Sequence, residues 1–331
     1  MYQQDQQDRM KKKKAIKGSC KRLIGFTILG IIILSFCLYL FLIYLPKFFS
    51  SQNHENLVRV NSKPLLALSI IPQEYFALKI GGDRIETMVL AGPGQNPHNF
   101  EPAPRQIQDL ARADAWVLSG TEFEIGLESK IRALFPHLRV VDGTQGISFR
   151  SLESGEHSGA DEADHAHGEF DRHYWLGQQG AELICLHIRD TLCAVDEDNA
   201  QFYRDNCEAQ VREIQLEFGK LKLELGILKG KTVFVYHPAF GYFLNEFGIN
   251  QEAVETGGKE PTPRILAELI ARAKEEKVRV IFVQAQFPAE SGRAVADAIG
   301  AELVVLDPLA PDWLANIREM GEALIRAAEK E

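Results

Sequence analysis

Three histidines occupy places in the sequence where they could hold a metal ion. His98 follows the apolar run 86–91 in AGPGQNPHNF, and His237 comes directly after the run Thr232–Tyr236 in VYHPAF. His173, in DRHYWL, lies between an acidic segment and a helical pattern. Neutral imidazoles suit Zn²⁺, which takes histidine nitrogens at about 2.0–2.1 Å. If the fold brings these side chains into one cleft, they form a zinc site.

A tetrahedral zinc site needs a fourth ligand. The segment DPLAPDWLANI offers Asp307 and Asp312 after the last apolar run, and water is the alternative if neither binds. Asp312 could instead be the N-cap of the final helix, and Asp307 could be a turn residue. Catalytic zinc keeps one coordination position open for water or substrate. A zinc ion with four protein ligands is therefore bound without taking part in a reaction.

Further histidines lie in the segment 153–173, which is rich in glycine and acidic residues. His157, His165 and His167 belong to it, and within the segment no apolar residue larger than alanine precedes Phe170. Such a composition predicts a solvated loop. Its histidines could collect metal loosely and pass it inward.

The apolar runs that precede these histidines predict the fold class. They alternate with helical patterns, which is typical of parallel sheets with covered faces. The predicted strands are 65–70, 86–91, 115–119 and 138–142, and then 232–236, 252–256, 278–284 and 302–307. We therefore expect an α/β fold with two lobes, each with a mainly parallel sheet flanked by helices.

A short internal similarity supports two lobes of like build. Glu101 opens EPAPRQIQDL and Glu260 opens EPTPRILAEL. In both segments a proline, Pro104 or Pro263, can start an amphipathic helix that leads to a strand.

One long helix is predicted between the lobes. A helical pattern without proline runs from roughly Asn199 to Leu228, and from Tyr203 onward its apolar residues recur every three or four positions. Some 30 helical residues would span about 45 Å. Such a rigid connection indicates a cleft whose lobes move little.

The N-terminus predicts a membrane anchor. The basic stretch MKKKKAIKGSCKR precedes Leu23–Leu45, which contains no charged residue and is long enough to cross a bilayer of about 30 Å. The lysines predict a cytoplasmic N-terminus and a body outside the inner membrane. We expect an uncleaved transmembrane helix, and removal of the segment or lipidation at Cys37 is the alternative.

These patterns divide the chain into six parts. We expect a basic tail (1–22), an anchor or signal (23–45), a tether (46–63), a first lobe (64–197), a linking helix (198–228) and a second lobe (229–331).

Charge and cysteine content exclude some classes of protein. The 331-residue chain has a formal net charge of −9 and no basic stripe beyond its N-terminus, which argues against nucleic-acid binding. None of the five cysteines forms a CxxC pair, so a thiolate zinc site is not expected. The sequence leaves two alternatives for the other cysteines: a disulfide that joins Cys207 to Cys185 or Cys193, or three buried free thiols.

Several motifs together resemble the zinc/manganese solute-binding proteins of ABC transporters, the ZnuA/TroA type. They occur in the order found in that family, from about Leu65 to Leu324. The motifs are GPGQNPHNFEPAPRQIQDLARADAWVLSGTEFE, FDRHYWL, YHPAFGYFLNEFGI, GKEPTPRILAELI, IFVQAQF and LDPLAPDWLANI. The resemblance implies two α/β lobes joined by one long helix, with metal between them.

The same resemblance implies a ligand set. The family's ligands fall on His98, His173 and His237, and its carboxylate at the start of the last helix falls on Asp312. Manganese-type members tend to carry glutamate at the third position, so His237 points to zinc. The sequence departs from the family at VQAQF, where Gln284 and Ala285 replace Glu-Pro.

The function implied is extracytoplasmic binding of Zn²⁺ and its delivery to an ABC permease, by a monomer. Manganese transport and a metal-stabilised adhesin are the alternatives. A zinc hydrolase would need an open metal position and a general base, and the chain has no HExxH motif. We therefore expect no enzymatic activity. Since imidazoles bind metal only when neutral, affinity is expected to fall below about pH 6.5.

Overall fold

The structure is a computed structural model that describes residues 63–151, 170–254, 262–286 and 289–329. The predicted tail, the anchor 23–45, the tether up to residue 62 and the three histidines of the acidic segment lie outside the described residues. Within the described ranges, no helix is both long enough and apolar enough to cross a membrane.

The first sheet has four parallel strands in the order β2-β1-β3-β4. The strands are β1 (Leu65–Ile70), β2 (Glu86–Ala91), β3 (Ala115–Val117) and β4 (Arg139–Val141), and the helices between them are α2 (Ile71–Gly81), α3 (Pro104–Leu110) and α4 (Glu124–Leu134). A short 3-10 turn, η1 (Gly82–Arg84), precedes β2. All residues of β1 after Leu65 are buried, as expected for a strand covered on both faces.

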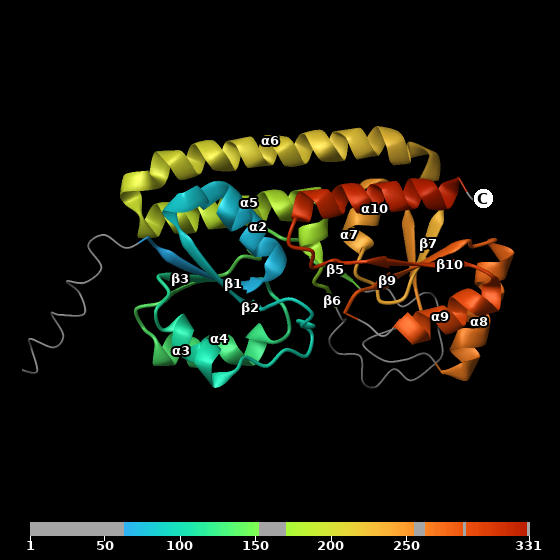
Figure 1. The fold of residues 1–331 in the computed structure, drawn as a ribbon, viewed down its shortest axis with the longest axis horizontal. Helices are drawn as coiled ribbons and strands as arrows, with labels where there is room; N and C mark the ends of the chain where they lie inside the picture. The colour runs from blue at the N-terminus through green and yellow to red at the C-terminus, as the bar shows by residue number, and fades with distance from the viewer. Residues whose placement is uncertain (1–62, 152–169, 255–261, 287–288, 330–331) are drawn as a thin grey trace, which may run out of the picture. The chain divides into compact units, whose positions relative to one another are not determined.

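The second sheet repeats this arrangement with the order β10-β9-β7-β8, again all parallel. It contains β7 (Thr232–Val235), β8 (Asn250–Ala253), β9 (Val280–Gln284) and β10 (Glu302–Leu306), with helices α7 (Gly241–Glu246), α8 (Pro263–Glu275), α9 (Ala289–Ile299) and α10 (Trp313–Ala328). Helices α3 and α8 begin at Pro104 and Pro263, as the sequence predicted. The two sheets lie side by side (Figure 1).

One strand lies at a different position from the one predicted. We expected a strand at 252–256, whereas β8 begins two residues earlier, at Asn250. This strand is at the edge of its sheet, and its first residues, Asn250 and Gln251, are polar. An edge strand need not be apolar, so the apolar pattern did not mark where it starts.

The segment between the sheets begins with a two-stranded antiparallel ladder. It pairs β5 (Arg150–Ser151) with β6 (Phe170–Asp171). The turn η2 (Tyr174–Leu176) and the helix α5 (Gln178–Val195) follow, and η3 (Glu197–Asn199) then leads into α6.

Helix α6 (Ala200–Glu224) carries the long apolar stripe. Its 25 residues span about 38 Å, and the stripe continues through the 3-10 turn η4 (Leu225–Leu228). The buried face of α6 and η4 includes Tyr203, Ile214, Phe218, Leu221 and Leu225. In Figure 1 this helix runs along both halves of the described molecule.

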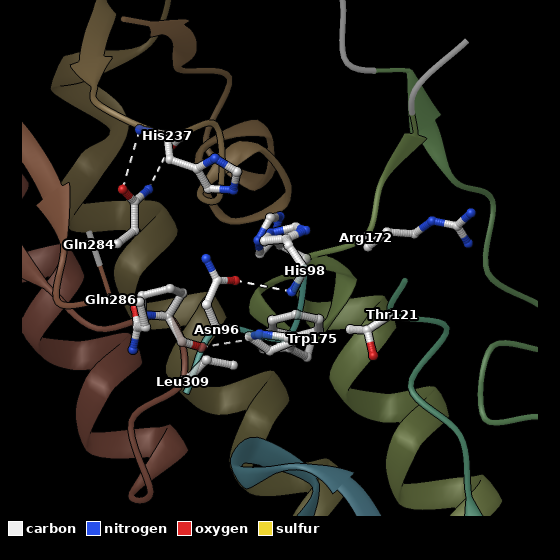
Figure 2. A pocket seen from close by; sticks show the side chains of 12 residues that line it. Asn96, His98, Thr121, Arg172, Trp175, His237, Gln284, Gln286 and Leu309 are labelled. Atoms are coloured by element: carbon white, nitrogen blue, oxygen red, sulfur yellow. Dashed lines mark hydrogen bonds between the residues drawn. The ribbon is translucent and has the colours of Figure 1, made fainter. Parts of the chain in front are cut away.

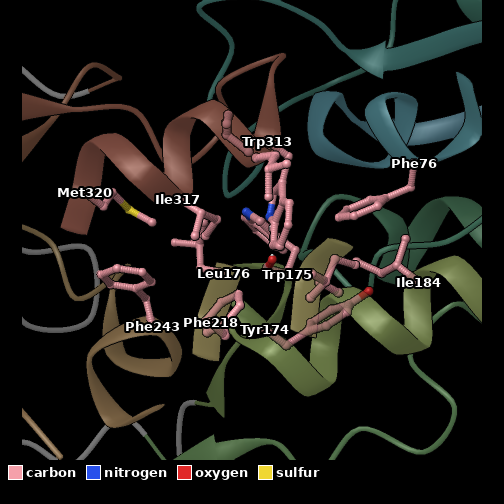
Figure 3. Close-up of a cluster of buried hydrophobic side chains, with 14 of the residues drawn as sticks. Phe76, Tyr174, Trp175, Leu176, Ile184, Phe218, Phe243, Trp313, Ile317 and Met320 are labelled. Atoms are coloured by element: carbon pink, nitrogen blue, oxygen red, sulfur yellow. Dashed lines mark hydrogen bonds between the residues drawn. The ribbon is translucent and has the colours of Figure 1, made fainter. Parts of the chain in front are cut away.

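One hydrophobic core joins the two halves. It includes Phe76 from α2, Trp175 from η2, Phe218 from α6 and Trp313 from α10 (Figure 3). Trp313 Nε1 donates a hydrogen bond to the Trp175 carbonyl oxygen at 2.7 Å, and Trp175 Nε1 donates to the Pro308 carbonyl oxygen at 2.8 Å. The sheets are therefore held by shared packing as well as by α6.

Helix α5 carries Cys185 and Cys193, helix α6 carries Cys207, and all three are free thiols. Cys185 and Cys207 are buried, and Cys193 is half-buried. Burial raises the pKa of the Cys185 thiol, so it stays protonated and unreactive.

Candidate metal centre

The fold brings His98, His173 and His237 together. Their ring centroids are 5.0–5.3 Å apart in all three pairs, and one ligand atom from each ring lies within 4.8 Å of the other two. His173 and His237 are each 7% exposed, and His98 is half-buried. Figure 2 shows His98 and His237 on facing sides of one pocket.

The carboxyl ends of the strands position two of these histidines. His98 lies in the loop after β2, where Asn96 Oδ1 accepts a hydrogen bond from His98 N at 3.0 Å. His237 lies two residues after the end of β7, and His173 lies between β6 and η2. Ligand sites of open α/β sheets form at such strand ends, and here the ends of both sheets contribute to one site.

Carboxylates hold the outer nitrogens of two rings. His98 Nδ1 lies 3.0 Å from Glu122 Oε2, and His173 Nδ1 lies 3.0 Å from Asp171 Oδ1. Since a carboxylate accepts the Nδ1–H proton, the lone pair is left on Nε2 of each ring. This pairing fixes the ring and raises its basicity as a metal ligand.

The two carboxylates lie in different surroundings. Burial of Glu122 raises its pKa, but the hydrogen bond with His98 and the electrostatic interactions with the His98 and His173 rings together outweigh burial, so its pKa lies below the ordinary value. Asp171 is only 3% exposed, and its Oδ1 also accepts from His173 N at 2.9 Å.

His237 is held through its backbone. Its N–H donates to Gln284 Oε1 at 3.3 Å, and Gln284 Nε2 donates to its carbonyl oxygen. Gln284 is the last residue of β9 and is buried. An amide suits this task because it can accept and donate at once, which a carboxylate cannot.

Neither aspartate that we considered as a fourth ligand lies in the cluster. Asp312 caps α10, where its Oδ1 accepts from Ala315 N at 3.0 Å. Asp307 Oδ1 accepts from Gln286 Nε2 at 2.6 Å and from Leu309 N at 2.9 Å. Among the described residues, the metal-binding group consists of the three imidazoles alone.

The pocket around the histidines is small. Its volume is about 20 Å³, which is room for an ion and a bound water but not for an organic ligand. The neutral polar residues Asn96, Thr121, Gln284 and Gln286 line it, together with apolar Trp175 and Leu309. The donor set fits Zn²⁺, and the fourth position is open to water.

Sequence reasoning missed both carboxylates. Asp171 had a local signal, because it stands two residues before His173 in FDRH and can reach back to the ring. Glu122 is 24 residues from His98, so only the folded loops reveal the pair.

Comparisons with known proteins show the family to which the chain belongs. The family model of ZnuA, described as zinc-uptake complex component A, periplasmic, matches residues 67–327. The zinc-binding lipoprotein AdcA of Streptococcus pneumoniae serotype 4 is 26% identical over 284 residues, covering 83% of this chain and 56% of AdcA. The high-affinity zinc uptake system protein ZnuA of Yersinia pestis is 26% identical over 263 residues, covering 73% of this chain and 81% of that protein.

The chain thus spans little more than half the length of the AdcA relatives that it matches. Among solved structures, a crystal structure of ZnuA has 31% identity and a TM-score of 0.73, covering 81% of this chain and 99% of that one. The solute-binding protein FpvC of Pseudomonas aeruginosa in complex with Mn²⁺ has 22% identity and a TM-score of 0.68, with 81% and 99% coverage, and shares the fold.

Proposed function

We propose a function from one premise: this chain belongs to the ZnuA family, the periplasmic component of a zinc-uptake complex. In this proposal it binds one Zn²⁺ outside the cytoplasm and delivers the ion to an ABC permease. The relatives named for zinc binding and zinc uptake support the cargo and the role.

The observation that carries the proposal is the meeting of three imidazoles from distant parts of the chain. We assign His98, His173 and His237 as the zinc ligands, since their ligand atoms lie within 4.8 Å of one another. In a tetrahedral zinc site such nitrogens lie about 3.3 Å apart, so small side-chain movements close the site around the ion. Water completes the tetrahedron, because Asp312 is occupied as a helix cap.

The site is suited to holding and releasing an ion. Glu122 and Asp171 orient two ligands, and the shared core limits movement of the halves. The position open to water is shared with catalytic zinc sites, but the carboxylates of Glu122 and Asp171 each hold a ligand ring. Zinc is therefore cargo in this proposal, and no described residue is assigned a catalytic role. We propose that the protein is not an enzyme.

Zinc is preferred to manganese on the chemistry of the donors. Mn²⁺ favours carboxylate and water oxygens, whereas imidazole suits Zn²⁺. The carboxylates near the site bind ring nitrogens instead of facing the centre. Manganese remains the alternative cargo, and nothing in the described structure favours an adhesin.

The remaining parts of the proposal concern the whole chain. We propose that Leu23–Leu45 anchors a monomer to the inner membrane, with the body in the periplasm or its equivalent. The division into lobes 64–197 and 229–331, joined by a linking helix at 198–228, belongs to the same proposal. The apolar length of Leu23–Leu45 and the basic residues before it support the anchor.

Zinc titration of purified variants tests the ligand set. Single alanine substitutions at His98, His173 and His237 are each expected to lower zinc affinity by about two orders of magnitude or more, whereas His187→Ala is the control. His187 is a histidine outside the cluster, whose Nε2 lies 2.8 Å from the Gln145 carbonyl oxygen. Competition with Mn²⁺ in the same assay decides the cargo. Wild-type affinity in the His237 variant would remove that residue from the site.

A further inference from the structure

The β5–β6 ladder connects the segment that carries His173 to the second half of the molecule. Arg150 pairs with Asp171 in the ladder, and Asp171 is the carboxylate that holds the His173 ring. Helix α7 begins at Gly241, four residues after His237. Contacts between the ladder and α7 therefore link the surroundings of two proposed ligands.

The hydroxyl of Tyr242 joins both strands of the ladder to α7. The Arg150 backbone N–H donates to Tyr242 Oη at 2.9 Å, and Oη donates to the Asp171 carbonyl oxygen at 3.2 Å. Burial raises the pKa of the Tyr242 phenol above its ordinary value, so the hydroxyl stays protonated and able to donate.

The side chain of Arg150 makes a second connection. Its Nη1 donates to the Gly241 carbonyl oxygen, and its Cζ lies 5.5 Å from the centre of the Tyr242 ring. Arg150 thus contacts the first two residues of α7: it bonds to the backbone of Gly241 and lies near the ring of Tyr242.

Gly241 leaves the space in which the Asp171 carboxylate lies. A Cβ at position 241 would be 2.8 Å from Asp171 Oδ2 and 3.4 Å from Arg150 Cζ. The backbone of Gly241 does not have a positive φ, so alanine fits its conformation. A side chain at position 241 is excluded by the Asp171 carboxylate. If an added methyl group displaced that carboxylate, Asp171 Oδ1 would move away from His173 Nδ1.

We propose that Arg150, Gly241 and Tyr242 form a brace that positions the Asp171 carboxylate and, through it, the His173 imidazole. The brace rests on the proposed zinc function, and its members are positioning residues that do not touch the ion. It also links the strand before His173 to the helix after His237. Losing it lets the His173 ring turn, so bound zinc dissociates faster.

Two substitutions in the full chain test the brace. Tyr242→Phe removes the bridging hydroxyl and keeps the ring. Gly241→Ala adds a methyl group against Asp171 without lowering helix propensity. Tyr203→Phe is the matched control, because the Tyr203 hydroxyl likewise donates a hydrogen bond to a part-buried oxygen, here of the Asp196 carboxylate, in the connection between α5 and α6.

The measurements are the rate of zinc release to a chelator, the Tm of the metal-free protein and ¹⁵N–¹H spectra of the imidazole rings. Both brace variants are expected to release zinc about tenfold faster or more, the lower end of the range for residues that orient metal ligands. In the metal-free protein they should also lose the fixed Nδ1–H form of His173. Tyr203→Phe should lower the Tm and leave the release rate and the His173 spectrum unchanged.

The outcomes separate the brace from the zinc function. If the wild-type protein binds no zinc, the zinc function fails, and the imidazole spectra still test the brace. If the wild-type protein binds zinc but Gly241→Ala and Tyr242→Phe release it at the wild-type rate with an unchanged His173 spectrum, the brace is overturned. The brace is also overturned if Gly241→Ala and Tyr242→Phe change the release rate no more than Tyr203→Phe does.

Discussion

The three histidines are held by two different devices. His98 and His173 each give Nδ1 to a carboxylate, whereas the Gln284 amide holds the backbone of His237. The first device controls the orientation and basicity of a ring, and the second controls where its backbone lies. Substitutions should therefore affect the three ligands in different ways.

Removing either carboxylate is expected to weaken zinc binding without removing a ligand. Glu122→Gln and Asp171→Asn should each lower zinc affinity by roughly 10–100-fold, the range for groups that orient metal ligands. Glu128→Gln is the control, since its exposed pair with Arg132 lies along α4. Calorimetric titration measures the change, and equal affinity in all four proteins would show that the carboxylates do not support the site.

Acid is expected to release zinc before it unfolds the protein. The lowered pKa of Glu122 means that its contribution to stability is present above its unfolded-state value, about 4.3, and is lost only as pH falls through the still lower folded value. Protons compete with zinc for imidazole nitrogens at higher pH, because an unperturbed imidazole has a pKa near 6.5. Zinc affinity should fall from pH 7 to 5 while circular dichroism stays constant. A pH-independent affinity over that range would contradict imidazole ligation.

At the scale of helices, α10 is tied to α6 by an ion pair. Arg318 Nε donates to Glu217 Oε2 at 2.6 Å, and the Glu217 side chain is only 8% exposed, against 47% for Arg318. The pair sits where the last helix of the second half packs on the connecting helix. A carboxylate left there without its partner would be costly, because it is largely removed from water.

Replacing Arg318 with leucine is expected to destabilise the fold by roughly 3 kcal/mol, since it leaves the Glu217 charge buried alone. Arg326→Leu, which breaks an exposed pair with Glu322 on the same helix, should cost less than about 1 kcal/mol. Urea unfolding of the metal-free proteins measures both. Equal losses in the two variants would mean that burial of Glu217 is not what matters.

Elements with a strong local signal were predictable. The prolines that start α3 and α8, and the buried strand β1, follow from local pattern. The start of the edge strand β8 was predicted two residues too late, because its first residues are polar. Asp312 shows the limit of local pattern. The resemblance predicted a metal ligand there and a helix cap was the alternative, and only the folded position of its side chain shows that it caps α10.

At the scale of the molecule, the halves are joined more extensively than the sequence indicated. The stripe on α6 was predictable from its spacing, but the Trp175–Trp313 contact joins residues 138 apart in the chain. No periodicity encodes such a pair. The same holds for the histidines: each was a candidate by its place after a strand or before a helix, and their distances became known only from the fold.

The shared core predicts that zinc changes stability much more than shape. Bound zinc should raise the free energy of unfolding by about 2.7 kcal/mol at a free concentration of 100 times Kd. Removing it with a chelator should leave the radius of gyration and the secondary structure unchanged. Small-angle scattering with and without zinc checks this, and a marked contraction on binding would indicate that the halves are hinged.

The central claim is that one zinc ion lies among three imidazoles. Anomalous diffraction from crystals grown with Zn²⁺, recorded above and below the zinc edge, tests it directly. The account predicts a single strong peak about 2.0–2.1 Å from a ring nitrogen of each of His98, His173 and His237. A peak elsewhere, or one bound by fewer than these three residues, would contradict it.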